Sequence, residues 1–398
     1  MKRTWTDETG RKHTVYGKTE REAADKLAER KRAVKNGEYG TSGKMTVRAW
    51  AAEWDKVYLK PKVRKAGAEK KRGTMTQKSY QMYGQKLDGY ILPEIGNMRM
   101  CDVKVGHLQE LVNEAAKLSE SHMQKVRLVL VKMFRQAVKS EVLVRSPAEG
   151  LELQAAEKNL RRSLTAYERE MVLRVSATHR CGQWIRFLLG TGIRPGESAP
   201  LQVRDIDLKD GIVHITKDIE SGTGVVSPPK TDAGIRDIPL PAWLVDEMTV
   251  WLDGKAAEDY VFPQTDGKSM KTITCIENDW RSFIRQVDLA MGAETTAHGH
   301  IYDPKDLNRD GSPKYPDPED KDKPRNGHKV AHDLVLYCLR HTYCTDLQRA
   351  GVPLNVARVL MGHEDIATTA NIYTHSGIEE VNMARDLINA HDKAKAKR

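Results

Sequence analysis

The chain has 398 residues and a formal net charge of +10, from 65 lysines and arginines against 55 aspartates and glutamates. This length favours two or three domains, and the charge suits a polyanionic partner without identifying it. The five cysteines are scattered, and no stretch approaches about eighteen apolar residues, so we expect no disulfides, no structural zinc, and neither a secreted nor a membrane-spanning protein.

Residues 1–44 predict a small basic module. Residues 2–6 and 11–16 have the pattern of strands on either side of turn residues, and we expect a three-stranded sheet here. Thr19 and Glu22 form a capping box that begins a helix, which ends at Asn36 and Gly37. A solvated charged helix on a small sheet is the alternative interpretation.

Residues 45–150 predict an all-helical domain. Val47, Trp50, Trp54 and Tyr58 recur at helical spacing, which indicates a stripe that packs into a core. Further helices are expected over residues 74–90, 107–118 and 121–142. Between the first two helices, residues 60–73 place seven basic residues against one acid, a run that we expect to be disordered or phosphate-bound.

A polar linker at 151–162 precedes a mainly helical domain, residues 163–398, with a small antiparallel sheet. Thr165 and Glu168 cap its first helix, and Arg194 follows a later helix that stops at residues 190–192. Residues 210–211 turn a hairpin, and Lys230 precedes an alternating strand. After residue 373 we expect an amphipathic helix with a basic tail. The whole chain is therefore predicted to be a multidomain α+β protein.

Residues 292–329 form a polar insert rich in proline and glycine, which predicts surface loops. Within it, residues 306–317 match the ligand spacing of calcium-binding loops. The candidate ligands are Asp306, Asn308, Asp310 and Asp317. Because no helices clearly flank the loop, an accidental match in an acidic segment is the favoured alternative.

Residues 336–375 bring together cations and a tyrosine. Arg340 offers a planar fork of donors that fits two phosphate oxygens, and the neighbouring His341 and the later His363 add donors of adjustable charge. Tyr373 supplies a phenol with a free pKa of about 10, which becomes a nucleophile only where cations stabilise the transition state. Such a set could make and break a phosphotyrosine without a metal or another cofactor.

The segments RHTYCTDLQRAGV, LMGHEDIATT and YTH resemble the C-terminal boxes of the tyrosine recombinases, the phage-type integrases. TGIRPGE resembles the family's other arginine box, and ILPEIG and SPAEG resemble turns of its helical, SAM-like core-binding domain. The resemblance implies an arm-type DNA-binding domain at 1–44, a core-binding domain at 45–150 and a catalytic domain at 163–398. It also implies DNA contacts from Lys2, Arg3, Arg11, Lys12, Lys60, Lys62, Arg64, Lys65, Lys70, Lys71 and Arg72.

The resemblance further implies a division of catalytic roles. Arg194 and Arg340 would clamp the scissile phosphate, and Lys230 would protonate the departing 5′ oxygen. Tyr373 would form a 3′-phosphotyrosine, with His341 and His363 orienting the phosphate and the nucleophile. The chain departs from the family at Tyr337, where histidine is usual. We expect Tyr337 to substitute as a neutral hydrogen-bond donor.

The expected function is integration or excision of a phage or another mobile element by DNA recombination in the cytoplasm, on the nucleoid. Expected partners are double-stranded DNA attachment sites and three further copies of the chain in a tetramer on DNA, together with a directionality factor and a host DNA-bending protein. Two alternatives remain: a type IB topoisomerase, which uses the same cleavage chemistry, and a regulator that binds DNA without catalysis.

Overall fold

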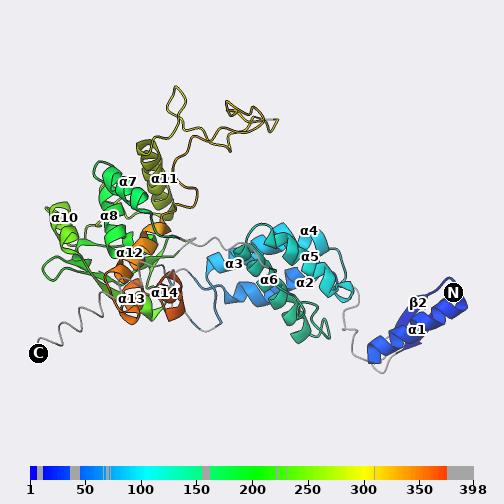
Figure 1. Ribbon diagram of the computed structural model, residues 1–398. Coiled ribbons are helices and arrows are strands. Elements are labelled where there is room, and N and C mark those ends of the chain that lie inside the picture. Colours follow the sequence, from blue (N-terminus) through cyan, green and yellow to red (C-terminus); the bar gives the residue numbers. More distant parts are fainter. Residues whose placement is uncertain are drawn as a thin grey trace, which may run out of the picture. The chain divides into compact units, whose positions relative to one another are not determined.

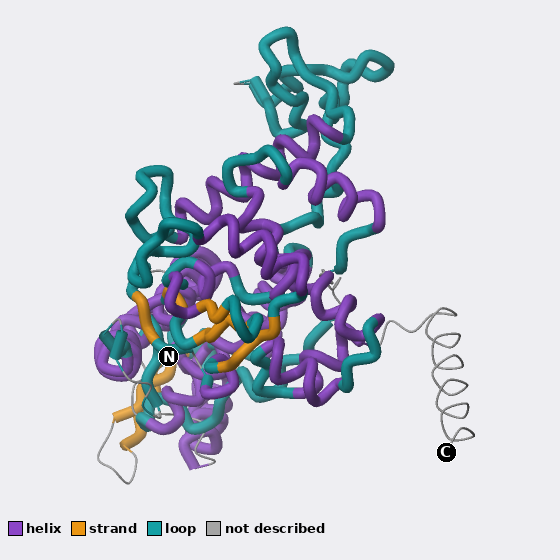
Figure 2. Tube along the Cα trace, turned by 90° about the vertical axis from the view of Figure 1, so that its left-hand side faces the viewer, coloured by secondary structure: helices purple, strands orange, loops and turns teal. Residues whose placement is uncertain are grey.

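The computed structural model describes residues 1–6, 12–35, 45–65, 67–68, 71, 73–154, 162–220, 223–229, 231–308 and 310–373. The chain divides into two compact units, one of residues 1–65 and 69–159 and one of residues 66–68 and 160–398 (Figure 1). Helices predominate in both, and the strands form small antiparallel sheets (Figure 2). A boundary within the first unit near residue 44 stays a prediction. Within the described residues, every helix is too short or too polar to span a bilayer.

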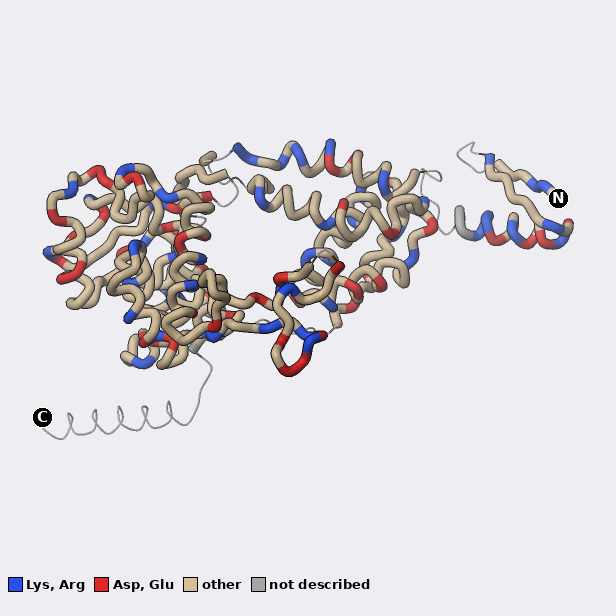
Figure 3. The backbone as a smooth tube through the Cα atoms, turned by 90° about the horizontal axis from the view of Figure 1, so that it is seen from above, with Lys and Arg blue, Asp and Glu red and all other residues tan. Residues whose placement is uncertain are grey.

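The N-terminal module has two described strands, β1 (Lys2–Thr6) and β2 (Lys12–Tyr16), paired antiparallel. The predicted third strand is not among the described residues, which continue from β2 into helix α1 (Glu20–Lys35). As predicted, the hydroxyl of Thr19 accepts a hydrogen bond from the backbone N–H of Glu22 (3.2 Å). Acidic and basic residues alternate along α1 (Figure 3).

The rest of the first unit is helical. Helix α2 (Val47–Trp54) continues through a π-helical turn, and α3 (Gln77–Lys86) continues through another into α4 (Leu92–Ile95). Helices α5 (Val105–Ala116) and α6 (Glu120–Lys139) complete the core. Trp50 and Trp54 are buried, as their spacing predicted, and the indole of Trp50 donates to the carbonyl of Met133 (3.2 Å).

The second unit begins with helices α7 (Ala166–Ser176), α8 (Gly182–Thr191) and α9 (Pro195–Ser198). Strands β3 (Ile206–Asp207), β4 (Ile212–Ile215) and β7 (Arg236–Pro239) form an antiparallel sheet in that order, and β5 (Asp218–Ile219) pairs with β6 (Val226–Ser227). The predicted turn at residues 210–211 joins β3 to β4, with Gly211 at a φ of 64°. The predicted capping box of Thr165 and Glu168 is present.

Five helices complete this unit: α10 (Ala242–Leu252), α11 (Ile273–Ala290), α12 (Tyr337–Arg349), α13 (Leu354–Met361) and α14 (Ile366–Tyr373). They share one hydrophobic core with α7, α8 and the sheet, in which Trp184, Phe187 and Phe283 are fully buried. The predicted C-terminal helix lies outside the described residues.

The polar insert leaves from the end of α11 and returns to it. Its described residues contain turns and isolated bridges but neither a helix nor a strand, as predicted. The buried carboxylate of Asp288 accepts hydrogen bonds from the ring of His328 (2.5 Å) and from the backbone N–H groups of Lys329 (2.7 Å) and Val330 (3.0 Å). One side chain of α11 therefore holds the returning end of the insert.

Candidate active site

Two helices that are far apart in sequence end at the same place in the second unit. Helix α8 ends at Gly192 and α13 ends at Gly362, with φ values of 62° and 60°. A Cβ at Gly192 would lie 2.1 Å from the ring of Tyr343, and one at Gly362 would lie 3.0 Å from the guanidinium of Arg236. Glycine is thus required at both helix ends for conformation and for space. Each end presents backbone carbonyls to the arginines described next.

Arg340 of α12 lies between these two helix ends and is only 2% exposed. Its Nη1 donates to the carbonyl of Gly192 (2.6 Å), and its Nη2 contacts the carbonyl of Met361 and the Nε2 of His363 (3.1 Å). Carbonyls at helix C-termini favour a cation. Burial and the charge of Arg194 lower the pKa of Arg340 to about 10, so it stays charged at neutral pH. Its Nε–H is buried and has no partner among the described residues.

Arg194 is the N-cap residue of α9 and follows closely after the end of α8. Its Nη2 donates to the carbonyl of Gly362 (2.9 Å), and its Nη1 donates to Glu197 Oε1 (2.7 Å). About a third of its side chain is exposed. Although burial opposes the charge, the neighbouring carboxylates of Glu197 and Asp218 keep the pKa of Arg194 raised. Both predicted arginines are therefore charged and are held by the same turn, residues 361–362.

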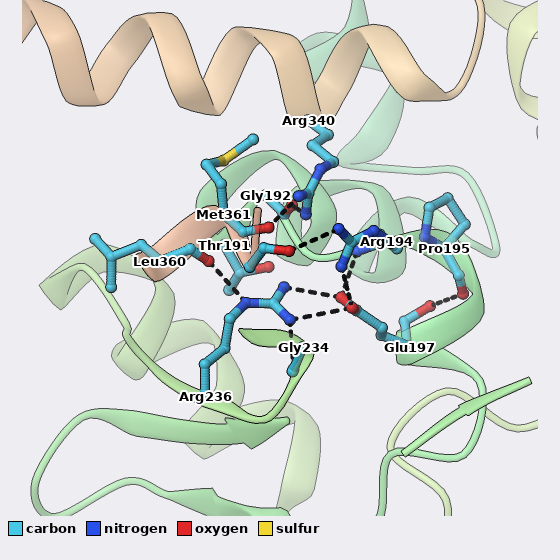
Figure 4. Close-up of polar contacts among 12 residues, drawn as sticks. Thr191, Gly192, Arg194, Pro195, Glu197, Gly234, Arg236, Arg340, Leu360 and Met361 are labelled. Atoms are coloured by element: carbon cyan, nitrogen blue, oxygen red, sulfur yellow. Dashed lines mark hydrogen bonds and ion pairs between the residues drawn. The ribbon is translucent and has the colours of Figure 1, made fainter. Parts of the chain in front are cut away.

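Two residues that the sequence did not single out complete this charge cluster. Glu197 and Arg236 are both buried, and they form a bidentate ion pair (Figure 4). Burial alone would raise the pKa of Glu197, but hydrogen bonds from Arg236 and the charges of Arg236, Arg194 and Arg340 lower it to about 2. The carboxylate is therefore ionised, and it partly balances three guanidinium groups.

His363 follows the second glycine and is 8% exposed. Its Nε2 must accept from Arg340, so its Nδ1 carries the proton and donates to the hydroxyl of Thr369 in α14 (2.9 Å). Burial and the positive charges of Arg340, Arg194 and Arg236 lower the pKa of His363 to about 3. His363 is thus a neutral link between Arg340 and the helix that ends at Tyr373.

This low pKa predicts a loss of stability in mild acid. Below about pH 6.5 His363 becomes protonated in the unfolded chain but not in the folded chain. The free energy of unfolding should therefore decrease as the pH decreases, by up to about 1.4 kcal/mol per pH unit. Urea unfolding at pH 7.5, 6 and 5 measures this slope, which His363→Gln should reduce. His298→Gln, at an exposed position, is the control, and an equal slope in all three proteins would contradict the assignment.

A cavity of about 630 Å³ opens beside these groups. Arg194, Tyr337 and His363 all line it, as does Thr368 of α14, while Arg340 lies buried behind them. The ring of Tyr337 lies 5.9 Å from the guanidinium carbon of Arg340. The departure from the usual histidine therefore places a phenol in the cavity.

The structure describes the remaining predicted catalytic residues only in part. Lys230 lies outside the described residues, although Pro229 and Thr231 on either side of it line the cavity. Tyr373 is the last residue of α14, and only its backbone is described. The ring of His341 lies 5.6 Å from that of Tyr337, but His341 is not one of the described residues that line the cavity.

The first unit has a basic cavity of about 560 Å³. Lys62, from the predicted basic run, lines it together with Lys132, Arg135 and Lys139 of α6. The spacing of three and four residues along α6, which puts these side chains on one face, was the signal available in the sequence. Arg11, Lys70 and Arg72 lie outside the described residues. The other predicted contacts are exposed or half-buried: Lys2, Arg3, Lys12, Lys60, Arg64, Lys65 and Lys71.

The structure does not bring the calcium-loop candidates together. Asp306 pairs with the ring of His300 (2.7 Å), and Asp310 accepts from the backbone N–H of Ser312 (2.9 Å). Asn308 donates to Ser312, and Asp317 accepts from the backbone of the residue two positions later. The described part of the chain contains no group of three or more His, Cys, Asp or Glu side chains placed to hold a metal ion.

Two protein-family models match this chain. The model described as the phage integrase family matches residues 156–301 and 325–380, and the match is interrupted inside the predicted insert. A second model, the N-terminal SAM-like domain of phage integrases, matches residues 68–116.

A tyrosine recombinase XerC-like protein of Caldanaerobacter subterraneus subsp. tengcongensis is 23% identical over 396 residues, covering 93% of this chain and 90% of the relative. The transposase of transposon Tn916 from Enterococcus faecalis is 24% identical, covering 48% of this chain and 41% of its own.

Solved structures share the fold at low sequence identity. The Tn1549 transposon integrase in complex with transposon right-end DNA aligns with a TM-score of 0.63 at 17% identity, covering 87% of this chain and all of the other. A lambda integrase tetramer bound to a Holliday junction aligns with a TM-score of 0.53 at 16% identity, covering 93% of this chain and 91% of the other.

Proposed function

The chain belongs to the phage integrase family and is a tyrosine recombinase, an enzyme that breaks and rejoins DNA, and from this premise we propose how its residues divide the reaction. The observation that carries the proposal is a single cavity lined by Arg194, Tyr337 and His363 beside the buried Arg340. This cavity would take the scissile phosphate, with Arg194 donating to its non-bridging oxygens and the charge of the buried Arg340 stabilising them from behind the cavity lining.

Cleavage then proceeds by in-line displacement. The phenol oxygen of Tyr373 forms a bond to phosphorus while the bond from phosphorus to the 5′ oxygen breaks, and Lys230 gives that oxygen its proton. The product is a 3′-phosphotyrosine, which keeps the energy of the phosphodiester bond for rejoining to another 5′-hydroxyl. His363 is neutral and both of its ring nitrogens are hydrogen-bonded, so it orients Arg340 and α14 and does not move a proton.

Tyr337 takes the usual place of a histidine as a neutral donor. Its phenol can give one hydrogen bond to a phosphate oxygen but adds no charge at neutral pH. Tyr337→Phe should therefore slow cleavage by about 10-fold or more. This factor is the low end of the cost of losing one hydrogen-bond donor to a charged group. Tyr337→His should cleave at least as fast as the wild type. Single-turnover cleavage rates would measure both changes. A wild-type rate for Tyr337→Phe would mean that Tyr337 does not contribute to cleavage.

The polyanionic partner that we propose for both units is duplex DNA that carries attachment sites. The basic cavity of α6 and the exposed lysines of the N-terminal module would contact phosphates without reading sequence. Because lambda integrase is a tetramer on a Holliday junction, we propose four copies of this chain on two paired sites. A directionality factor and a host DNA-bending protein would act with them, and a third strand would complete the N-terminal sheet of an arm-binding domain.

The test is to trap the covalent intermediate. Purified protein is incubated in EDTA with a duplex nicked close to the crossover point, so that a short leaving fragment diffuses away, and a denaturing gel then separates any adduct. An adduct is expected without divalent metal. Binding without an adduct on the true site would contradict the proposal and leave a DNA-binding regulator.

Joining between two duplexes decides between a recombinase and a type IB topoisomerase. Two differently labelled duplexes with attachment sites should give joined products whose yield rises with the occupancy of both sites. Relaxation of supercoiled DNA with no joined product would favour the topoisomerase. Sites with a reversed crossover sequence serve as the control, because their strands cannot pair after exchange.

A further inference from the structure

Arg236 is a second buried cation of the candidate site, with 1% of its side chain exposed. It begins β7, and its guanidinium reaches three other segments. Its Nε donates to the carbonyl of Leu360 at the end of α13 (2.8 Å), and its Nη1 donates to the carbonyl of Gly234 (2.9 Å). The two Nη groups also donate to both oxygens of Glu197 (3.0 and 2.8 Å). A side chain this enclosed cannot touch DNA, so any role in cleavage acts through its partners.

The carboxylate of Glu197 is shared between two arginines. Its Oε1 accepts from Nη1 of Arg194 (2.7 Å) and from Nη1 of Arg236 (3.0 Å). Its Oε2 accepts from the backbone N–H of Arg194 (2.8 Å) and from Nη2 of Arg236 (2.8 Å). Without Arg236, Glu197 would be free to rotate and to pair fully with the side chain of Arg194. A full pair would neutralise Arg194 and turn its guanidinium from the cavity.

We propose that Arg236 is a positioning residue for DNA cleavage, which holds Glu197 so that Glu197 anchors Arg194 without becoming its full counter-ion. The guanidinium of Arg194 then keeps the charge and direction that a scissile phosphate requires. The bonds of Arg236 to Leu360 and Gly234 fix this arrangement to the end of α13 and to the turn that follows Lys230. The inference rests on the proposed function, because it assigns Arg194 to the phosphate.

The test compares two substrates in single-turnover cleavage. One carries the ordinary scissile phosphate, and in the other a methyl group replaces one non-bridging oxygen, so that the group is neutral and needs less stabilisation from Arg194. Arg236→Lys keeps the buried charge but cannot form the bidentate pair. It is expected to slow cleavage of the phosphate about 100-fold, the usual cost of a small misplacement, and cleavage of the methylphosphonate only about 5-fold. Arg194→Ala should give the same pattern.

Arg186→Lys is the matched control. Arg186 forms an arginine–glutamate pair with Glu247 in the same unit, but neither residue lines the cavity, and both substrates should be cleaved as by the wild type. Equal slowing of both substrates by Arg236→Lys would overturn the proposal and leave Arg236 a structural residue, as would no slowing of either.

A second variant guards against misfolding. Arg236→Met combined with Glu197→Gln removes both buried charges, so neither is left unpaired. Because this variant also loses the carboxylate that anchors Arg194, the guanidinium of Arg194 loses its direction and the same difference between substrates is expected. Equal slowing would again overturn the proposal. If instead the wild type forms no adduct on either substrate, the proposed function itself has failed.

Discussion

With phenylalanine in place of Tyr373, the protein is expected to bind its DNA site as before and to form no covalent adduct. The change removes one oxygen, and loss of a nucleophile typically costs more than about 10⁴-fold in rate. Helix α14 should keep its place, because Thr369 is fully buried and bonded to His363, and Ile372 packs against the core of the unit. Adduct yield in the trapping assay and DNA affinity by fluorescence anisotropy measure the two parts of the prediction.

Tyr167→Phe is the control, since Tyr167 is exposed on α7, away from the cavity. The outcome that would contradict the assignment has a specific form. Tyr337 is a second phenol and lines the cavity. An adduct retained by Tyr373→Phe and lost in Tyr337→Phe would make Tyr337 the nucleophile.

Replacing Arg340 with lysine should lower the cleavage rate about 10² to 10³-fold, although the charge is conserved. The planar guanidinium of Arg340 contacts Gly192, Met361 and His363 at once, which fixes its charge behind the cavity. A lysine ammonium is a single point charge and cannot bond to both helix ends at once. A buried carbonyl left unpaired also costs about 1–3 kcal/mol, so the unfolding midpoint should fall as well.

The measurements are single-turnover cleavage and urea unfolding. Arg349→Lys, at an exposed position in the last turn of the same helix, should change neither. Wild-type cleavage by Arg340→Lys would mean that a point charge is sufficient, and that the hydrogen bonds to the two helix ends are not needed for catalysis.

The sequence predicted the parts of the site that lie in short local patterns. Arg194, Arg340 and His363 each stand in a recognisable segment, and the structure places them together. Glu197 was quoted in the first arginine box but given no role, because nothing local indicates a partner that is 39 residues away.

Arg236 was missed although the pattern contained a signal. In the predicted strand it alternates in phase with Ile238, and both are buried while Asp237 is exposed. A charged residue in the buried phase of a strand requires a buried partner of opposite charge. The third strand of the N-terminal sheet stays a prediction. Residues 2–16 supply only two strand-like stretches, and the capping box at Thr19 commits the next residues to a helix.

Arg194 and Arg340 are held by two helix ends, and this matters for chains that are incomplete. Arg194 is held by a carbonyl that lies 168 residues later, and Arg340 is held by carbonyls on both sides of it in sequence. A nascent chain that has not yet emerged beyond α13, or one that a protease has cut there, lacks both anchors from that turn. Such fragments are expected to lack an assembled cleavage site, so only a chain completed beyond α13 could nick DNA.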